Sequence, residues 1–350
     1  MAKSIGASRL SKKRRDNLSY MSRYASPCLV TGGAGFLGSH LVDSLVSNNI
    51  VVKVLDNLSC GSISNISRHL DNKSLGFVNS DISNLEVLNS TMRDTCTVYH
   101  LAANPEVFSG FRDPEVAFNQ NIRNTFYLLE AVRRSRTVDR LAFTSSSAVY
   151  GEPSVIPTPE NYGVLLPISQ YGASKLACEA LISSYSHNYG LKGLILRLVN
   201  IVGPRNKHGV LRDFMNKLNR DNRKLEILGD GFQSKSYLHV NDFVESVFMS
   251  FPEICRKGST IEVFNIGNED KIDVLSIART VCRSMNLKET QLRATGGIEN
   301  GRGWAGDVKN MQLDISRIKK IGWAPTLSSL EAITLSCSQI LKEMTGLGSV

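Results

Sequence analysis

A glycine-rich turn near the start of the chain constrains the fold more than any other feature of the sequence. Residues 31–38 read Thr-Gly-Gly-Ala-Gly-Phe-Leu-Gly, with glycines at Gly32, Gly35 and Gly38, between an apolar β-branched run and a helical pattern. Glycine permits a tight strand-to-helix turn and lets the backbone approach a diphosphate, whose charge is met by N–H groups at the helix N-terminus. The motif is short, so its meaning depends on the segments that follow it.

Short β-branched runs alternate with helical stretches as far as residue 200. This alternation predicts a Rossmann-type, doubly wound α/β fold, in which right-handed crossovers place helices on both faces of a parallel sheet. The predicted strands are residues 28–31, 51–55, 76–79, 97–101, 141–145 and 193–198. The predicted helices are residues 35–47, 84–92, 114–134 and 171–189.

The alternation loosens after residue 200. Short strand patterns at 225–228, 236–240 and 262–266 mix with helical patterns at 241–251 and 274–285, which indicates a smaller C-terminal α/β lobe that completes a substrate pocket. We therefore divide the chain into a leader at 1–26, a Rossmann domain at 27–200 and a mainly substrate-binding lobe at 201–345.

The net charge of +9 is concentrated at the front of the chain. Residues 1–26 hold seven Lys or Arg and a single acid, Asp16, so three net positive charges remain for the rest. We interpret this stretch as a disordered basic leader; the alternatives are an organelle or nuclear address, or untranslated sequence upstream of a start at Met21. It lacks an apolar segment, which excludes a secretory signal. Because the leader contains no recognised nucleic-acid reading element, we expect no nucleic-acid partner.

The seven cysteines are odd in number, scattered and without a CxxC pair. This pattern argues against a disulfide framework or a zinc site and favours a reducing, cytoplasmic compartment. The six histidines form no cluster with metal-ligand spacing, so we assign no metal. No apolar run approaches the roughly 20 residues that a membrane span needs.

Residues at the ends of the next strands extend the cofactor prediction. Asp56 ends the second predicted strand, where a carboxylate can accept hydrogen bonds from an adenosine ribose and repel a 2′-phosphate. Asn57 and Leu58 follow it in place of an arginine, so we predict NAD rather than NADP. The same crevice should receive Asp81 and Ile82 from the third strand and Leu101, Ala102 and Ala103 from the fourth.

A Tyr/Lys pair and a serine segment supply candidate catalytic groups. Tyr171 and Lys175 lie one helical turn apart on one face, and an ammonium beside a phenol favours the phenolate, which can act as a base. Ser145, Ser146 and Ser147 end the fifth predicted strand, at the sheet edge where such folds bind ligands. A serine hydroxyl there can bridge a sugar hydroxyl and the tyrosine oxygen.

Together these motifs resemble the extended short-chain dehydrogenase/reductase family, and within it the nucleotide-sugar epimerases of the UDP-glucose 4-epimerase type. The resemblance runs from residue 28 to about residue 333. Besides the motifs above, it includes His100-Leu-Ala-Ala103, Pro167-Ile-Ser-Gln-Tyr171, Arg197-Leu-Val-Asn200-Ile-Val-Gly-Pro204-Arg205, Tyr237-Leu-His-Val-Asn-Asp242 and Gly306-Asp307.

The resemblance implies roles residue by residue. The NAD site would be lined by the glycine turn and by Phe36, Leu37, Asp56, Asn57, Asp81, Ile82, Leu101, Ala102, Ala103, Asn121, Tyr171, Lys175 and Val199. Tyr171, Lys175 and Ser146 would be catalytic, with Ser147 as the alternative serine. The nucleotide sugar would be bound by Ser146, Ser147, Asn200, Lys235, Arg302 and Asp307. The resemblance also implies a homodimer built from the helices that contain Asn121 and Tyr171.

Two departures from the family pattern concern the predicted substrate site. Lys235 stands where many members have arginine, which binds a diphosphate more rigidly. This difference predicts either weaker substrate binding or a task shared between Arg302 and Arg212. The glycine-rich stretch 296–306 is long, so Arg302 is placed less securely than Tyr171.

The serine segment favours one reaction over others. Related 4,6-dehydratases and decarboxylases carry an acid where this chain has Ser147 and Ala148, so we predict NAD-dependent epimerisation at C4 of a UDP-hexose such as UDP-glucose. The alternatives are an epimerase for uronate or N-acetylhexosamine nucleotides, or a dehydratase or reductase of the same family. A non-enzymatic dinucleotide-binding protein is disfavoured because the Tyr/Lys pair is present.

Overall fold

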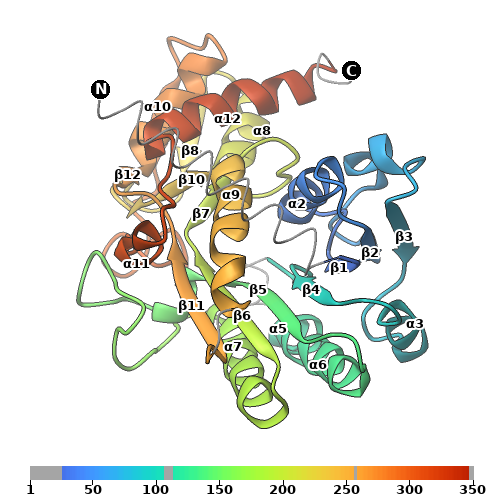
Figure 1. Ribbon diagram of the computed structural model, residues 1–350. Helices are drawn as coiled ribbons and strands as arrows, with labels where there is room; N and C mark the ends of the chain where they lie inside the picture. Colours follow the sequence, from blue (N-terminus) through green and yellow to red (C-terminus); the bar gives the residue numbers. More distant parts are fainter. Residues whose placement is uncertain (1–25, 106–112, 256–257, 347–350) are drawn as a thin grey trace, which may run out of the picture.

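A seven-stranded sheet forms the centre of the molecule in the computed structural model, which describes residues 26–105, 113–255 and 258–346. The strand order is β11-β6-β5-β4-β1-β2-β3, and every neighbouring pair is parallel (Figure 1). The order reverses between β1 and β4, which is the point where doubly wound sheets open a ligand crevice. The predicted Rossmann-type α/β fold is confirmed.

The strands of this sheet are short and mostly buried. They are β1 (Cys28–Thr31), β2 (Val52–Asp56), β3 (Leu75–Asn79), β4 (Thr97–His100), β5 (Arg140–Ser146), β6 (Lys192–Leu198) and β11 (Ile261–Ile266). All residues of β1 and β4 are buried, as expected of central strands with a helix layer on each side.

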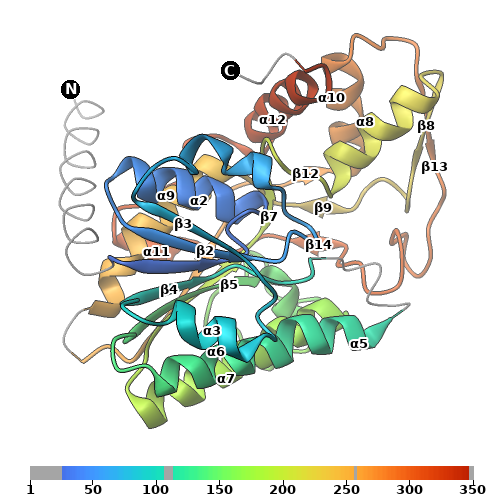
Figure 2. The same cartoon turned by 90° about the vertical axis from the view of Figure 1, so that its right-hand side faces the viewer.

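Helices cover both faces of the sheet (Figure 2). One face carries α3 (Leu85–Thr91), α5 (Pro114–Ala117), α6 (Asn124–Arg134) and α7 (Gln170–Tyr189), and the other carries α2 (Phe36–Ser47) and α9 (Val240–Ser250). Each face has its own apolar core, with Leu128, Phe143 and Ile182 in one and Leu41, Tyr99 and Phe243 in the other. The sheet is thereby held rigidly from both sides.

The smaller lobe has a third core, which includes Phe214, Ile277 and Ile333. Its helices are α8 (Val210–Arg220), α10 (Val274–Ser284) and α12 (Ser329–Met344). Its short strands are β7 (Asn200–Val202), β8 (Lys224–Ile227), β9 (Ser234–Lys235), β10 (Tyr237–His239), β12 (Ile272–Asp273), β13 (Gln291–Ala294) and β14 (Asn310–Met311).

Three segments beyond residue 200 belong to the central layers rather than to the lobe. β11 pairs with β6 along its whole length, α9 packs against α2, and the short α11 (Ser316–Lys320) packs against β11. The chain therefore enters the lobe after β6, returns to the central layers through α9 and β11, and returns to them once more at α11. The sequence could not indicate this return, because the composition of a strand does not show which other strand it pairs with.

A second difference concerns the predicted helix 114–134. It is interrupted by a π-helical stretch, Phe118–Arg123, between α5 and α6. Within this stretch Asn121 is buried; its side-chain oxygen accepts from the Asn104 N–H at 2.8 Å, and its amide donates to the Ser174 hydroxyl at 2.8 Å. π-helical turns inside helices are often found at functional sites. Here the turn lets Asn121 join two segments near the crevice.

A buried ion pair fixes α7 to the sheet. Glu179 on α7 accepts hydrogen bonds from Nε and Nη2 of Arg197 on β6, the shortest at 3.0 Å and 2.7 Å respectively, and both residues are buried. The Ser145 hydroxyl on β5 also donates to Glu179. Arg197 Nη1 donates to the Tyr150 hydroxyl at 2.9 Å, which donates to Asn265 on β11 at 2.7 Å. This network joins α7 to three neighbouring strands.

Arg197→Met should therefore destabilise the fold, because it leaves the buried carboxylate of Glu179 without its cation. We expect the free energy of unfolding, measured by urea denaturation, to fall by about 3–5 kcal/mol. The double variant Glu179→Met/Arg197→Met removes both charges and should recover part of the loss. A single variant as stable as the wild type would show that the pair does not hold α7 in place.

Candidate active site

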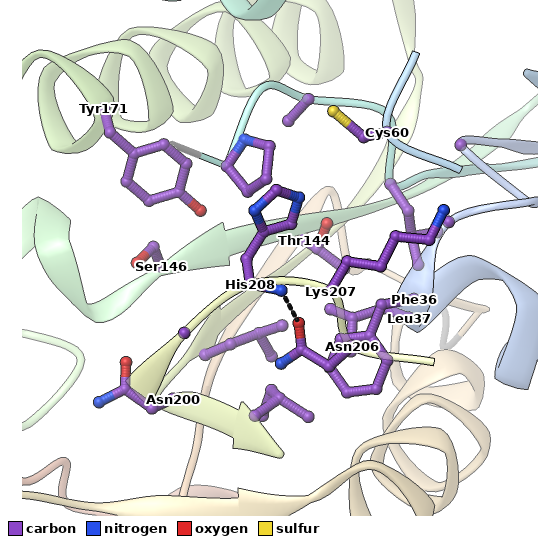
Figure 3. Close-up of a pocket in the computed structure, with 18 of the residues that line it drawn as sticks. Phe36, Leu37, Cys60, Thr144, Ser146, Tyr171, Asn200, Asn206, Lys207 and His208 are labelled. Atoms are coloured by element: carbon purple, nitrogen blue, oxygen red, sulfur yellow. Dashed lines mark hydrogen bonds between the residues drawn. The ribbon is translucent and has the colours of Figure 1, made fainter. Parts of the chain in front are cut away.

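A cavity of about 800 Å³ opens at the carboxyl ends of the central strands (Figure 3). Its wall includes residues that follow β1, β2, β4, β5 and β6, together with residues of the smaller lobe. The cavity lies at the edge and at the reversal of strand order where doubly wound sheets bind dinucleotides. Its position therefore agrees with the site predicted from the sequence.

The glycine turn is closed so tightly that side chains are excluded. Gly32 has φ +70°, and a Cβ added to Gly38 would lie 2.1 Å from the Gly32 carbonyl oxygen. Helix α2 begins directly after the turn, with Gly35 at its N-cap, no side-chain cap and no acid in its first turn. Its first N–H groups therefore lie at the cavity wall beside Phe36 and Leu37, ready to bind an anionic group.

Asp56 holds the turn in shape and also lies on the cavity wall. One carboxylate oxygen accepts from the Ala34 N–H at 2.9 Å and the other from the Leu58 N–H at 2.8 Å. Each carboxylate oxygen can accept a second hydrogen bond, so ribose hydroxyls can still bind. Next to it, the Asn57 amide donates to Asp81 at 2.6 Å. A helix N-terminus for the diphosphate and a carboxylate for the ribose are the groups that NAD requires.

Helix α7 presents the Tyr/Lys pair to the cavity. Ser169 caps the helix by accepting from the Gly172 N–H at 3.1 Å. The Lys175 ammonium is buried, donates to the Thr144 carbonyl at 2.8 Å and lies 5.8 Å from the centre of the Tyr171 ring. Burial lowers the pKa of Lys175 to about 8, so the ammonium is still mostly charged at neutral pH.

Burial raises the pKa of the Tyr171 phenol to about 12, and hydrogen bonding with the Ser146 hydroxyl opposes the rise. The sequence predicted that the Lys175 ammonium would favour the phenolate, whereas burial is the largest influence on the pKa of this phenol. Figure 3 shows Tyr171 and Ser146 on the same side of the cavity. Ser147 also lines the cavity, but Ser146 is the serine that acts on the pKa of Tyr171.

Twenty of the predicted site residues line this one cavity. They are Gly32, Gly35, Phe36, Leu37, Gly38, Asp56, Asn57, Asp81, Ile82, Leu101, Ala102, Ala103, Ser146, Ser147, Tyr171, Lys175, Val199, Asn200, Lys235 and Asp307. Segments far apart in the sequence thus converge as the motifs predicted.

Two predicted site residues do not line the cavity. Asn121 lies behind it, where its side chain bridges Asn104 and Ser174. Arg302 is held by the acids Glu152, at 2.8 Å, and Glu299, at 3.6 Å. Arg302 thus forms ion pairs within the chain, and its contact with phosphate stays a prediction.

Apart from Arg212, which the sequence offered as a partner of Arg302, sequence reasoning missed one stretch of the wall, residues 203–213, between β7 and the first turn of α8. Figure 3 shows Asn206, Lys207 and His208 in the cavity, with the His208 N–H donating to Asn206 at 3.1 Å. The available signal was the position of this stretch just after the predicted sixth strand, at the same sheet edge as the glycine turn. Its basic residues carry no recognisable spacing.

Several other expectations concern features outside the cavity. Except for Ser26, the basic leader lies outside the described residues. All seven cysteines are free thiols. Among the described residues, no group of three His, Cys, Asp or Glu side chains could hold a metal ion. No helix in that part of the chain has both the length and the apolar character to cross a membrane.

Comparisons with known proteins agree with this geometry. A family model described as GDP-mannose 4,6 dehydratase matches residues 29–335. A putative UDP-glucose 4-epimerase of Methanocaldococcus jannaschii is 32% identical over 311 residues, which span 87% of this chain and 95% of that protein.

Two crystal structures of sugar-nucleotide epimerases share the fold. A UDP-galactose 4-epimerase is 38% identical, with a TM-score of 0.81 and coverage of 91% of this chain and 99% of that one. The UDP-glucuronic acid 4-epimerase of Bacillus cereus, in complex with UDP-glucuronic acid and NAD, is 28% identical, with a TM-score of 0.80 and coverage of 90% and 99%.

Lys175→Met should raise the pKa of Tyr171 in the NAD-loaded protein. The ammonium favours the phenolate, so its removal should shift the Tyr171 titration upward by roughly one to three pH units. The measurement is the ultraviolet absorbance of tyrosinate against pH, with the spectrum of Tyr171→Phe subtracted as the blank. Identical titrations of wild type and variant would mean that Lys175 does not act on the phenol electrostatically.

Proposed function

The chain belongs to the nucleotide-sugar epimerase and dehydratase branch of the extended short-chain dehydrogenase/reductase family, and we propose that it is an NAD-dependent epimerase that inverts C4 of a UDP-hexose. The observation that carries the proposal is the position of Tyr171, Lys175 and Ser146 on the wall of a cavity whose other side fits NAD. UDP-glucose and UDP-galactose are the proposed substrate pair, and the names of the relatives support this choice.

Tyr171 acts on the sugar hydroxyl. Its phenolate accepts the proton of the sugar 4-hydroxyl and later returns it, and Lys175 stabilises the negative charge in between. Ser146 lies on the same side of the cavity as Tyr171 and is placed to hold the same hydroxyl. NAD, when bound, supplies the acceptor and donor for the hydrogen on C4. Inversion also requires the 4-keto sugar to turn over, which a cavity of about 800 Å³ allows.

The wall beside Tyr171 supports epimerisation over dehydration. Dehydration needs an additional acid to move a second proton and release water. At this place the chain has the neutral residues Ser147 and Ala148, and both line the cavity. Reversible transfer at one carbon requires no further acid, so the groups present suffice for an epimerase.

We also propose that the enzyme is a cytoplasmic homodimer. The seven free thiols suit a reducing compartment. The large side chains of Phe118 and Phe126 are exposed near the start of the helix pair α6 and α7, and Tyr189 is exposed at the end of α7. Two copies packed through these helices would cover this apolar surface.

Tyr171→Phe should lower kcat for interconversion of UDP-glucose and UDP-galactose by roughly 10²- to 10⁴-fold, because the proton acceptor is lost. NAD content and UDP affinity should be unchanged. The control is Tyr189→Phe, which removes the hydroxyl of an exposed tyrosine on the same helix and should behave as wild type.

The same assay should include UDP-N-acetylglucosamine and UDP-glucuronate, with all products resolved. Near-wild-type turnover by Tyr171→Phe would exclude the proposed base. Turnover of UDP-glucuronate alone would mean that the substrate is a uronate nucleotide and not a UDP-hexose. A product that has lost water would mean that the enzyme is a dehydratase, and stoichiometric consumption of NADH would mean that it is a reductase.

A further inference from the structure

The nucleotide sugar carries a diphosphate, and the two cations expected to bind it are already occupied within the chain. The Lys235 ammonium lies 2.6 Å from a carboxylate oxygen of Asp307, which is itself buried. Arg302 pairs with Glu152 at 2.8 Å and does not line the cavity. A diphosphate placed against Lys235 would therefore also meet the negative charge of Asp307.

Arg212, in the first turn of α8, is the cation without such a partner. It lies on the cavity wall, and its Nη1 atom is buried with no hydrogen-bond acceptor among the described residues. The neighbouring acid, Asp213, is paired with Lys217 at 2.9 Å. A buried guanidinium nitrogen without an acceptor is costly, and an anion in the cavity would remove that cost.

The backbone around Arg212 supports the same ligand. Helix α8 is eleven residues long and begins after Gly209, which provides no side-chain cap. The first N–H groups of the helix are therefore available beside the guanidinium, and the helix dipole is positive at that end. Gly209 to Arg212 all line the cavity.

Other basic residues of the same wall have different surroundings. Arg205 forms an ion pair with Asp43 at 2.7 Å. The Lys207 ammonium lies 3.5 Å from the carbonyl of Gly61, in the loop that follows Asp56 on the cofactor side. Arg212 is thus the cation of this wall that remains for an anion on the lobe side.

We propose that Arg212 binds the diphosphate of the nucleotide sugar, together with the N-terminus of α8, and takes over the task expected of Lys235 and Arg302. This inference rests on the proposed function, since it assumes a nucleoside diphosphate as the substrate group. The planar fork of the guanidinium suits bidentate contact with phosphate oxygens.

The test is calorimetric titration of the NAD-loaded protein with UDP and with uridine. Arg212→Leu should weaken UDP binding by roughly 10- to 100-fold and leave uridine binding and NAD content unchanged, because only the phosphate contact is lost. Arg212→Lys keeps the charge without the fork and should lie in between. The control is Arg220→Leu, an exposed arginine at the end of the same helix, which should match the wild type.

The outcomes separate this inference from the proposed function. If the wild type binds UDP and Arg212→Leu binds it equally well, Arg212 is not the diphosphate ligand, whatever reaction the enzyme catalyses. Loss of NAD from Arg212→Leu, with UDP affinity retained, would place the contact on the cofactor and also overturn the inference. If the wild type prefers dTDP or GDP over UDP, the proposed UDP-hexose is wrong, and the same variants test Arg212 with the preferred nucleotide.

Discussion

The buried pair of Glu179 and Arg197 is the interaction on which the site depends. Tyr171 and Lys175 lie on α7, whereas Ser146 and the Thr144 carbonyl lie on β5. They can work together only if the helix keeps a fixed position along the strand. The Ser145 hydroxyl connects Glu179 to β5 one helical turn from Lys175, and the ion pair connects Glu179 to the neighbouring strand β6. Tyr150 and Asn265 extend the connection to β11. The polar network inside the fold is therefore part of the catalytic geometry.

Burial shifts the pKa values of the two reactive groups, Tyr171 and Lys175, in opposite directions. It raises the pKa of Tyr171 to about 12 and lowers that of Lys175 to about 8, so the protein alone favours a neutral phenol. The positive charge of an oxidised nicotinamide would shift the balance toward phenolate. The base would then be formed mainly when the cofactor is in place. Coupling of this kind keeps the reactive oxygen from acting before the site is complete.

Local patterns predicted much of the fold and the site. The glycine turn, Asp56 and the Tyr171/Lys175 spacing report conformations or chemistry set within a few residues, and all of them line one cavity. What the sequence missed depends on contacts between distant segments. β11 joins the sheet by pairing with β6, and Arg302 is held by Glu152. The sequence offered Arg212 beside Arg302 for the diphosphate, but only the pairing of the neighbouring charges in the structure favours Arg212. The spacing of residues along the chain does not show which distant residues or strands will contact one another.

The central claim is that Tyr171 moves only the hydroxyl proton, while the hydrogen bonded to C4 never passes to water. The most direct measurement uses UDP-glucose labelled with deuterium at sugar C4, incubated with the enzyme in ordinary water. We expect the UDP-galactose formed to keep the deuterium at C4, with none released to the solvent. Loss of deuterium during epimerisation would mean that a base removes the C4 hydrogen as a proton, which contradicts the role assigned to Tyr171.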